Sequence, residues 1–205
     1  MRTPALLALV LLAISSVAQA NETVSLAGQL RVGIDGLSLA DAGAIVVFLE
    51  AQGDTPSPGG AAPPPAQVRQ VGARFEPAFL AVAVGQVVEM PNDDVIYHNV
   101  FSYSEPNDFD LGMYPAGASR SLRFEHAGLI RIYCSIHEEM DGSIFVAPSR
   151  LHAVPDSAGH YSLSDVPIGK YRLHVWSARL PELVRAVEIG ADSPTIDLVL
   201  GGSAG

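Results

Sequence analysis

The sequence contains one cysteine, few basic residues and no long apolar run after its first twenty residues. Because a lone cysteine cannot form an internal disulfide, Cys134 is paired between chains, exposed and reactive, or bound to a metal. Lysine and arginine number 12 against 22 aspartate and glutamate residues, and the formal charge of −10 argues against a nucleic-acid partner. No stretch beyond residue 20 reaches the roughly 20 apolar residues that a bilayer span needs, so we expect no membrane span there.

The first twenty residues have the composition of a secretory signal peptide. Arg2 gives a positive start, residues 5–17 form a short apolar stretch, and residues 18–20 read Ala-Gln-Ala, a small-residue cleavage pattern. We therefore expect residues 1–20 to be removed and the mature protein to be exported to the periplasm.

Helix signals are scarce as well, because no long segment places apolar residues at intervals of three and four. Short β-type runs separated by Gly, Pro, Asn and Asp predominate, and residues 43–50 form a strong candidate for a buried strand. This pattern predicts an all-β protein of the sandwich type. Residues 52–66, rich in Pro and Gly, predict an exposed linker, and residues 105–118 predict a loop.

The loop that follows residue 133 carries three metal-binding side chains at intervals of three: Cys134, His137 and Met140. His98, on an earlier predicted strand, is a fourth candidate. Two imidazoles and a thiolate with a weak axial thioether form the ligand set of blue-copper electron-transfer sites. Zinc also binds Cys and His, but a zinc site would normally take a fourth strong ligand in place of the thioether. The sequence therefore predicts one copper ion that cycles between Cu(I) and Cu(II).

The predicted strand at residues 129–134 aims the cysteine inward. Ile130, Ile132 and Cys134 fall on one face of it, because side chains alternate along a strand. Two isoleucines on that face indicate the core side of the strand. We therefore expect the Cys134 thiol to point into the protein.

The same residues resemble the metal-binding segments of the cupredoxins. The spacing C-x-x-H-x-x-M-x-G at residues 134–142, followed by an Ile-x-Val strand, is similar to the short ligand loop of amicyanin, whereas plastocyanin and pseudoazurin have two more residues between His and Met. Asn92 and the His-Asn-Val sequence at 98–100 match the family's first-histidine segment, and residues 75–85 match the approach to it. The resemblance covers residues 68–147, most of the predicted domain at residues 67–150, and implies a Greek-key β-sandwich.

The resemblance also implies a role for each matching residue. The strong ligands would be His98, Cys134 and His137, with Met140 as the axial ligand. Asn99 would tie the first-histidine strand to the loop near Ser135. His137 would be the ligand nearest the surface, where electrons enter and leave. The plastocyanin-like loops usually have Pro before the second histidine, whereas this chain has Ile136.

The two ends of the chain resemble a second family. Residues 159–173 follow the Gly, Tyr and Pro pattern of carboxypeptidase-regulatory-like (transthyretin-like) β-sandwiches, and residues 24–30 and 40–50 are similar to the opening strands of that module. The predicted organisation is a discontinuous sandwich of residues 21–51 and 151–201, with the cupredoxin domain inserted in it or flanked by it. This combination resembles exported proteins of the methylamine-utilisation or plastocyanin-like kind.

Acidic residues are frequent in the segments expected around the copper ligands. They are Asp93, Asp94, Asp108, Asp110, Glu138, Glu139 and Asp141. Such residues either solvate the loops or form an acidic rim that steers a basic redox partner, for example a c-type cytochrome. The remaining histidines, which we expect to be ordinary surface residues, are His126, His152, His160 and His174.

These expectations together describe an exported type 1 copper protein that carries single electrons between redox partners. Enzymatic activity is not expected, since four protein ligands leave no open position for a substrate. Two other functions remain open: a copper carrier or store that hands on Cu(I), and a structural β-sandwich module with a vestigial site.

Overall fold

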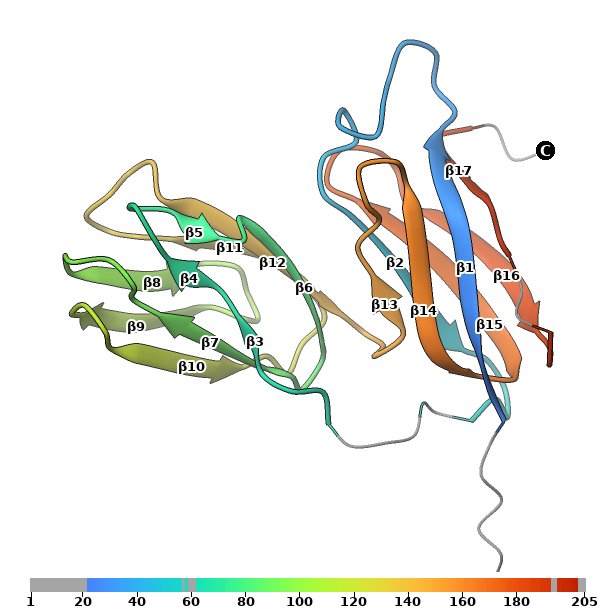
Figure 1. Cartoon of the computed structure of the whole chain (residues 1–205), viewed down its shortest axis with the longest axis horizontal. Coiled ribbons are helices and arrows are strands. Elements are labelled where there is room, and N and C mark those ends of the chain that lie inside the picture. The colour runs from blue at the N-terminus through green and yellow to red at the C-terminus, as the bar shows by residue number, and fades with distance from the viewer. Residues whose placement is uncertain (1–21, 57, 59–61, 193–194, 203–205) are drawn as a thin grey trace, which may run out of the picture.

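The structure, a computed structural model, describes residues 22–202 apart from 57, 59–61 and 193–194. The predicted signal peptide at 1–20 lies outside these described residues. The described part of the chain is all-β, and it includes no helix that could cross a membrane. Figure 1 shows two β-sandwiches side by side, with the chain crossing from one to the other and back. The all-β sandwich class predicted from the sequence is confirmed.

One sandwich, called here the terminal sandwich, is built from both ends of the described chain. Its strands are β1 (Thr23–Val32), β2 (Ile45–Ala51), β13 (His152–Ala153), β14 (His160–Pro167), β15 (Gly169–Ser177), β16 (Leu183–Ile189) and β17 (Leu198–Leu200). One sheet has the order β14-β1-β17 and the other the order β13-β2-β15-β16. β1 pairs antiparallel with β14 and parallel with β17. The first strand of the chain therefore lies between two strands from its C-terminal part.

The other sandwich, called here the inserted sandwich, lies between β2 and β13 in the chain. Its strands are β3 (Ala66–Gln67), β4 (Arg69–Gln70), β5 (Phe75–Glu76), β6 (Phe79–Ala83), β7 (Val87–Pro91), β8 (His98–Ser102), β9 (Phe109–Tyr114), β10 (Ser119–Arg123), β11 (Gly128–Tyr133) and β12 (Asp141–Ala147). A sheet of order β10-β7-β3 faces a sheet of order β6-β12-β11-β8-β9, and β4 pairs with β5.

Each sandwich encloses its own hydrophobic core. Tyr171, Leu173 and Val175 alternate along β15, and all three are buried in a cluster that includes Leu26 and Leu30 of β1. A separate cluster fills the inserted sandwich and contains the cysteine. The division of the chain into the predicted domains and the boundaries of those domains stay a prediction.

A third, smaller cluster joins the two sandwiches. The Phe145 ring of β12 lies 4.4 Å from the Trp176 ring of β15 and 6.1 Å from the Phe48 ring of β2, measured between ring centroids. The cluster also contains Val46, Phe79, Ala81 and Ala147. β12 begins directly after the predicted ligand loop. The aromatic contact therefore holds in place the strand to which the C-terminal end of that loop is connected.

The prediction of a loop at residues 105–118 was wrong, because this segment contains β9. The strand pairs antiparallel with β8 and sets Tyr114 opposite His98. Gly112 has a left-handed φ of 67°, and the pairing shifts register between Asn99 and Phe101. Asp110 and Gly112, which are turn-forming residue types, therefore belong to an irregular but paired strand.

Not all of the histidines expected on the surface are there. His174 is only 6% exposed, and its ring stacks on that of Phe48 with 4.7 Å between the ring centroids. Nδ1 lies 2.9 Å from Oε1 of Glu182. Nε2 lies 3.0 Å from Oε2 of Glu50, but the two atoms are not aligned for a hydrogen bond. The prediction was wrong for His174 because neighbouring side chains cover the outer face of β15 there. His152 is half-buried, whereas the histidines that are exposed as predicted are His126 and His160.

Candidate metal centre

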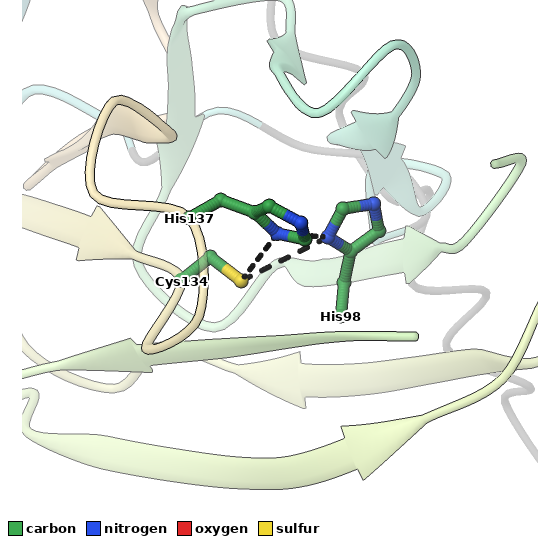
Figure 2. A group of neighbouring side chains, drawn as sticks. All are labelled: His98, Cys134 and His137. Carbon is green, nitrogen blue, oxygen red and sulfur yellow. Dashed lines mark hydrogen bonds between the residues drawn. The ribbon is translucent and has the colours of Figure 1, made fainter. Parts of the chain in front are cut away.

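His98 lies at the start of β8, between β9 and β11 in the five-stranded sheet. Its side chain is completely buried. Nε2 lies 2.8 Å from Oδ2 of Asp94, while Nδ1 faces the loop that follows β11 (Figure 2). A histidine that is held through one ring nitrogen can present the other to a metal.

Cys134 follows β11 directly, and the exposures of Ile130, Ile132 and Cys134 are 0%, 1% and 5%. The inward direction predicted from strand alternation is therefore confirmed. The N–H of Cys134 donates to the carbonyl of Met140 at 3.2 Å, and the N–H of Met140 donates to the carbonyl of His137 at 3.0 Å. These two bonds close residues 134–140 into a compact loop that keeps the second histidine beside the cysteine.

The three predicted strong ligands converge (Figure 2). Nδ1 of His98 is 3.0 Å from Nδ1 of His137 and 3.8 Å from Sγ of Cys134, and the remaining side of the triangle, from Sγ to Nδ1 of His137, is 3.5 Å. The point equidistant from these atoms lies about 2.0 Å from each, and metal–nitrogen and metal–sulfur bonds are about 2.0–2.3 Å long. Among the described residues, these three form the one group of His, Cys, Asp or Glu side chains compact enough to hold a metal.

Met140 follows His137 by three residues. It is 1% exposed and belongs to the same buried cluster as Cys134. The loop hydrogen bonds fix its backbone on both sides, through its N–H and its carbonyl. Its role as the axial ligand stays a prediction.

Asn99 ties the two ligand segments together. Its Oδ1 accepts a hydrogen bond from the backbone N–H of Ser135 at 2.8 Å and another from the Ser135 hydroxyl at 2.9 Å. Asn99 follows His98, and Ser135 follows Cys134, so the bonds connect the strand of one candidate ligand to the loop of the other candidates. This link, which the cupredoxin resemblance implied, is confirmed.

Asp94 has a position that the sequence did not reveal. Its carboxylate accepts hydrogen bonds from the N–H groups of Gly72, at 2.6 Å, and Ala73, at 2.8 Å, in addition to facing His98. Burial raises the pKa of Asp94, but the hydrogen bonds from Ala73, Gly72 and His98 outweigh burial and hold the pKa below its usual value. The only signal in the sequence was the spacing of four residues between Asp94 and His98, which alone is weak.

A buried polar cluster lies beside His98. The Tyr114 hydroxyl donates to the Met90 carbonyl at 2.9 Å, and Nε2 of Gln70 donates to the same hydroxyl oxygen at 2.5 Å. Burial raises the pKa of Tyr114 to about 12, so this phenol is neutral at physiological pH. The cluster connects β4, β7 and β9 next to the first histidine.

A cavity of about 560 Å³ opens beside His137 and Met140. The turn between β4 and β5 lines it on one side, and the acidic residues of the ligand loop line it on the other; they are Glu138, Glu139 and Asp141. These three side chains and Asp93 are exposed. Asp110 pairs opposite Phe101, so it lies further along the sheet from His98 than Tyr114 does.

No family model and no curated protein matches this chain. Similar solved structures include a purple cupredoxin from Nitrosopumilus maritimus, with 28% identity over 40% of this chain and 99% of that one and a TM-score of 0.36. A copper-containing nitrite reductase from Thermus scotoductus SA-01 is 28% identical over 46% of this chain, with a TM-score of 0.40, and only 25% of its own length is covered. A reduced amicyanin variant is 23% identical over 49% of this chain and 99% of its own, with a TM-score of 0.38.

Proposed function

We propose that this protein is a type 1 copper protein that carries single electrons. The observation that carries the proposal is the triangle of His98 Nδ1, Cys134 Sγ and His137 Nδ1, whose centre lies one metal–ligand bond length from each atom. These three residues would hold one copper ion, with Met140 as the axial ligand. Bound copper would supply the Cu(II)/Cu(I) couple.

The residues around the triangle would keep the ligands in one geometry for both oxidation states. The Asn99 hydrogen bonds hold Ser135, the loop hydrogen bonds hold Met140, and Asp94 holds the buried imidazole. A ligand set that is fixed before the metal binds has little to rearrange when the charge of the ion changes. Rigidity of this kind suits electron transfer.

His137 would be the route for electrons, since it is half-buried and lines the cavity, whereas His98 is completely buried. The exposed carboxylates of Glu138, Glu139 and Asp141 lie beside it. They would favour a positively charged redox protein as partner, for example a basic c-type cytochrome.

The proposal extends to the rest of the chain. Residues 67–150 would be the cupredoxin domain, residues 52–66 its linker, and residues 21–51 with 151–201 a carboxypeptidase-regulatory-like sandwich that supports it. Residues 1–20 would direct export to the periplasm. We propose no enzymatic reaction, because two imidazoles, a thiolate and a thioether would fill the coordination sphere.

The test is to titrate the mature chain with Cu(II) and to record its visible spectrum and redox cycling. Intense thiolate-to-copper absorption that bleaches reversibly on reduction is the expected result. Cys134→Ser should abolish it, and His126→Ala, which changes an exposed histidine outside the site, should not. Immediate reduction to a labile Cu(I) complex would favour a copper carrier or store. No stoichiometric binding would contradict both proposals and leave a structural module with a vestigial site.

A further inference from the structure

Asp94 is surrounded by hydrogen-bond donors. Its side chain is only 15% exposed. The carboxylate accepts hydrogen bonds from the N–H groups of Gly72 and Ala73, and its Oδ2 lies 2.8 Å from Nε2 of the fully buried His98. Its own N–H donates to Oδ1 of Asn92 at 3.1 Å. The carboxylate is therefore fixed from several sides and presents a defined acceptor to one imidazole nitrogen.

This arrangement determines which nitrogen of His98 carries the proton. A carboxylate that already accepts two backbone N–H groups has only acceptor positions left for the imidazole. Nε2 of His98 must then be the protonated nitrogen, and Nδ1 keeps its lone pair. Nδ1 is the atom that faces Cys134 and His137.

We propose that Asp94 is a positioning residue that holds His98 in the Nε2–H tautomer and strengthens Nδ1 as a ligand. Carboxylate groups commonly orient metal-binding histidines in this way and raise their basicity. The proposal rests on the proposed copper function for its consequence at the metal. The tautomer itself is a property of the metal-free protein.

The turn between β4 and β5 shows how firmly the carboxylate is held. Gly72 has φ of 60° and Ala73 has φ of 54°, so an alanine occupies the left-handed region that side chains other than glycine rarely adopt. A strained backbone conformation of this kind persists where surrounding contacts hold it in place. Here the N–H groups of Gly72 and Ala73 both donate to the carboxylate of Asp94. One residue thus couples this turn, which lines the cavity beside His137, to the buried ligand.

The negative charge of Asp94 should favour the more highly charged copper ion. Coulomb attraction through the imidazole is greater for Cu(II) than for Cu(I). Asp94→Asn should therefore weaken Cu(II) binding about ten- to hundredfold, as loss of such a partner typically does, and should weaken Cu(I) binding less. If the two losses differ tenfold, the reduction potential rises by about 59 mV.

The experiment compares Asp94→Asn with wild type in two measurements. Long-range ¹H–¹⁵N NMR on the metal-free protein reports the His98 tautomer: we expect Nε2–H in wild type and a larger Nδ1–H fraction in the variant. Spectroelectrochemistry and competition titrations with Cu(I) and Cu(II) then give the potential and both affinities. Asp93→Asn is the matched control, because Asp93 is the adjacent carboxylate and pairs with Arg69 at the surface.

A purely structural role for Asp94 would give a different result. If Asp94→Asn unfolds the turn, the same substitution is made together with Ala73→Gly, since glycine adopts a left-handed φ without strain. A folded variant that keeps the wild-type tautomer and potential, or a wild-type protein with His98 in the Nδ1–H form, would overturn the proposal. Absence of copper binding by the wild type would contradict the proposed function, while the tautomer measurement would still decide the role of Asp94.

Discussion

Nδ1 of His98 and Nδ1 of His137 lie 3.0 Å apart, so the space between them has room for one proton and not for two. A metal ion between the rings would be bound by both lone pairs at once. Because the three donor atoms meet only in the folded chain, the ion would stabilise that chain, by up to about 4 kcal/mol at a free concentration of 1,000 times its Kd. We expect chelation of copper to lower the unfolding temperature, measured by calorimetry.

Cys134→Ser serves as the control for that measurement. Its unfolding temperature should change little on addition of copper or chelator, because it lacks the sulfur of the triangle. Equal unfolding temperatures for the copper-treated and chelated wild-type protein would show that no metal is bound at this site.

Asn99→Ala should destabilise the metal-free protein by about 1–3 kcal/mol. The substitution removes the side-chain oxygen that accepts two hydrogen bonds, so the N–H and the hydroxyl of Ser135 both lose their acceptor. Copper should also dissociate faster, since the ligand loop loses its tie to β8. Urea unfolding and stopped-flow transfer of copper to a chelator measure the two effects. Asn107→Ala, which removes one exposed hydrogen bond to the His126 carbonyl and none to a candidate ligand or its loop, should leave copper dissociation unchanged.

Phe145→Ala should cost about 3–5 kcal/mol of folding free energy, because Phe145 is 5% exposed and fills the contact between the sandwiches. Denaturant unfolding followed by Trp176 fluorescence measures this loss, since the indole lies 4.4 Å from the ring that is removed. Tyr103→Ala is the matched aromatic control: Tyr103 is 82% exposed, so its loss should stay within about 0.5 kcal/mol. Similar values for both variants would contradict the structural importance of the contact.

His152 should make the protein less stable as the pH falls below about 6.5. Burial lowers the pKa of His152 from its usual 6.5, although the carbonyls of Ser149, Ala81 and Arg150 partly offset it. Between the folded and unfolded pKa values the unfolded chain binds more protons, so the free energy of unfolding decreases as the pH drops. Urea titrations from pH 7.5 to pH 5 should show a weaker dependence on pH for His152→Gln than for the wild type, whereas a substitution at exposed Tyr103, Tyr103→Ala, should leave that dependence unchanged.

Electron exchange with a basic cytochrome should slow as ionic strength rises, if the carboxylates beside His137 steer the encounter. The double substitution Glu138→Gln/Glu139→Gln should lower the rate at low salt and flatten its salt dependence, measured by stopped-flow absorbance. The charge-matched control is Glu188→Gln/Asp192→Asn, at exposed positions on the terminal sandwich. A salt-independent rate in the wild type would rule out steering by these residues.

Local patterns were sufficient to predict part of the metal centre. Strand alternation predicted that Cys134 points inward, and the spacing of three residues placed His137 on the same short loop. Both are consequences of geometry within a few residues. The resemblance to the cupredoxin first-histidine segment suggests His98 as a further candidate, and the structure brings its Nδ1 to within 3.8 Å of the thiol.

Contacts between distant segments were not predictable in the same way. Asp94 resembled any exposed loop aspartate, because its partners Gly72 and Ala73 lie on a separate turn of the chain. The turn-forming residues of 105–118 predict a loop, whereas pairing with β8 outweighs them and forms β9. Strand alternation predicts an exposed His174, but residues of a neighbouring strand and a loop, Glu50 and Glu182, lie against it.

The insertion of one sandwich into the other sets an order of events as the chain is made. The inserted sandwich has all of its strands once residue 147 is available, so its core can close early. β1 and β2 are synthesised before it, yet their sheet partners β14, β15 and β17 come last. During synthesis β1 and β2 therefore lack these partners until the last third of the chain is made, and this leaves their unpaired edges and apolar side chains open to aggregation for longest.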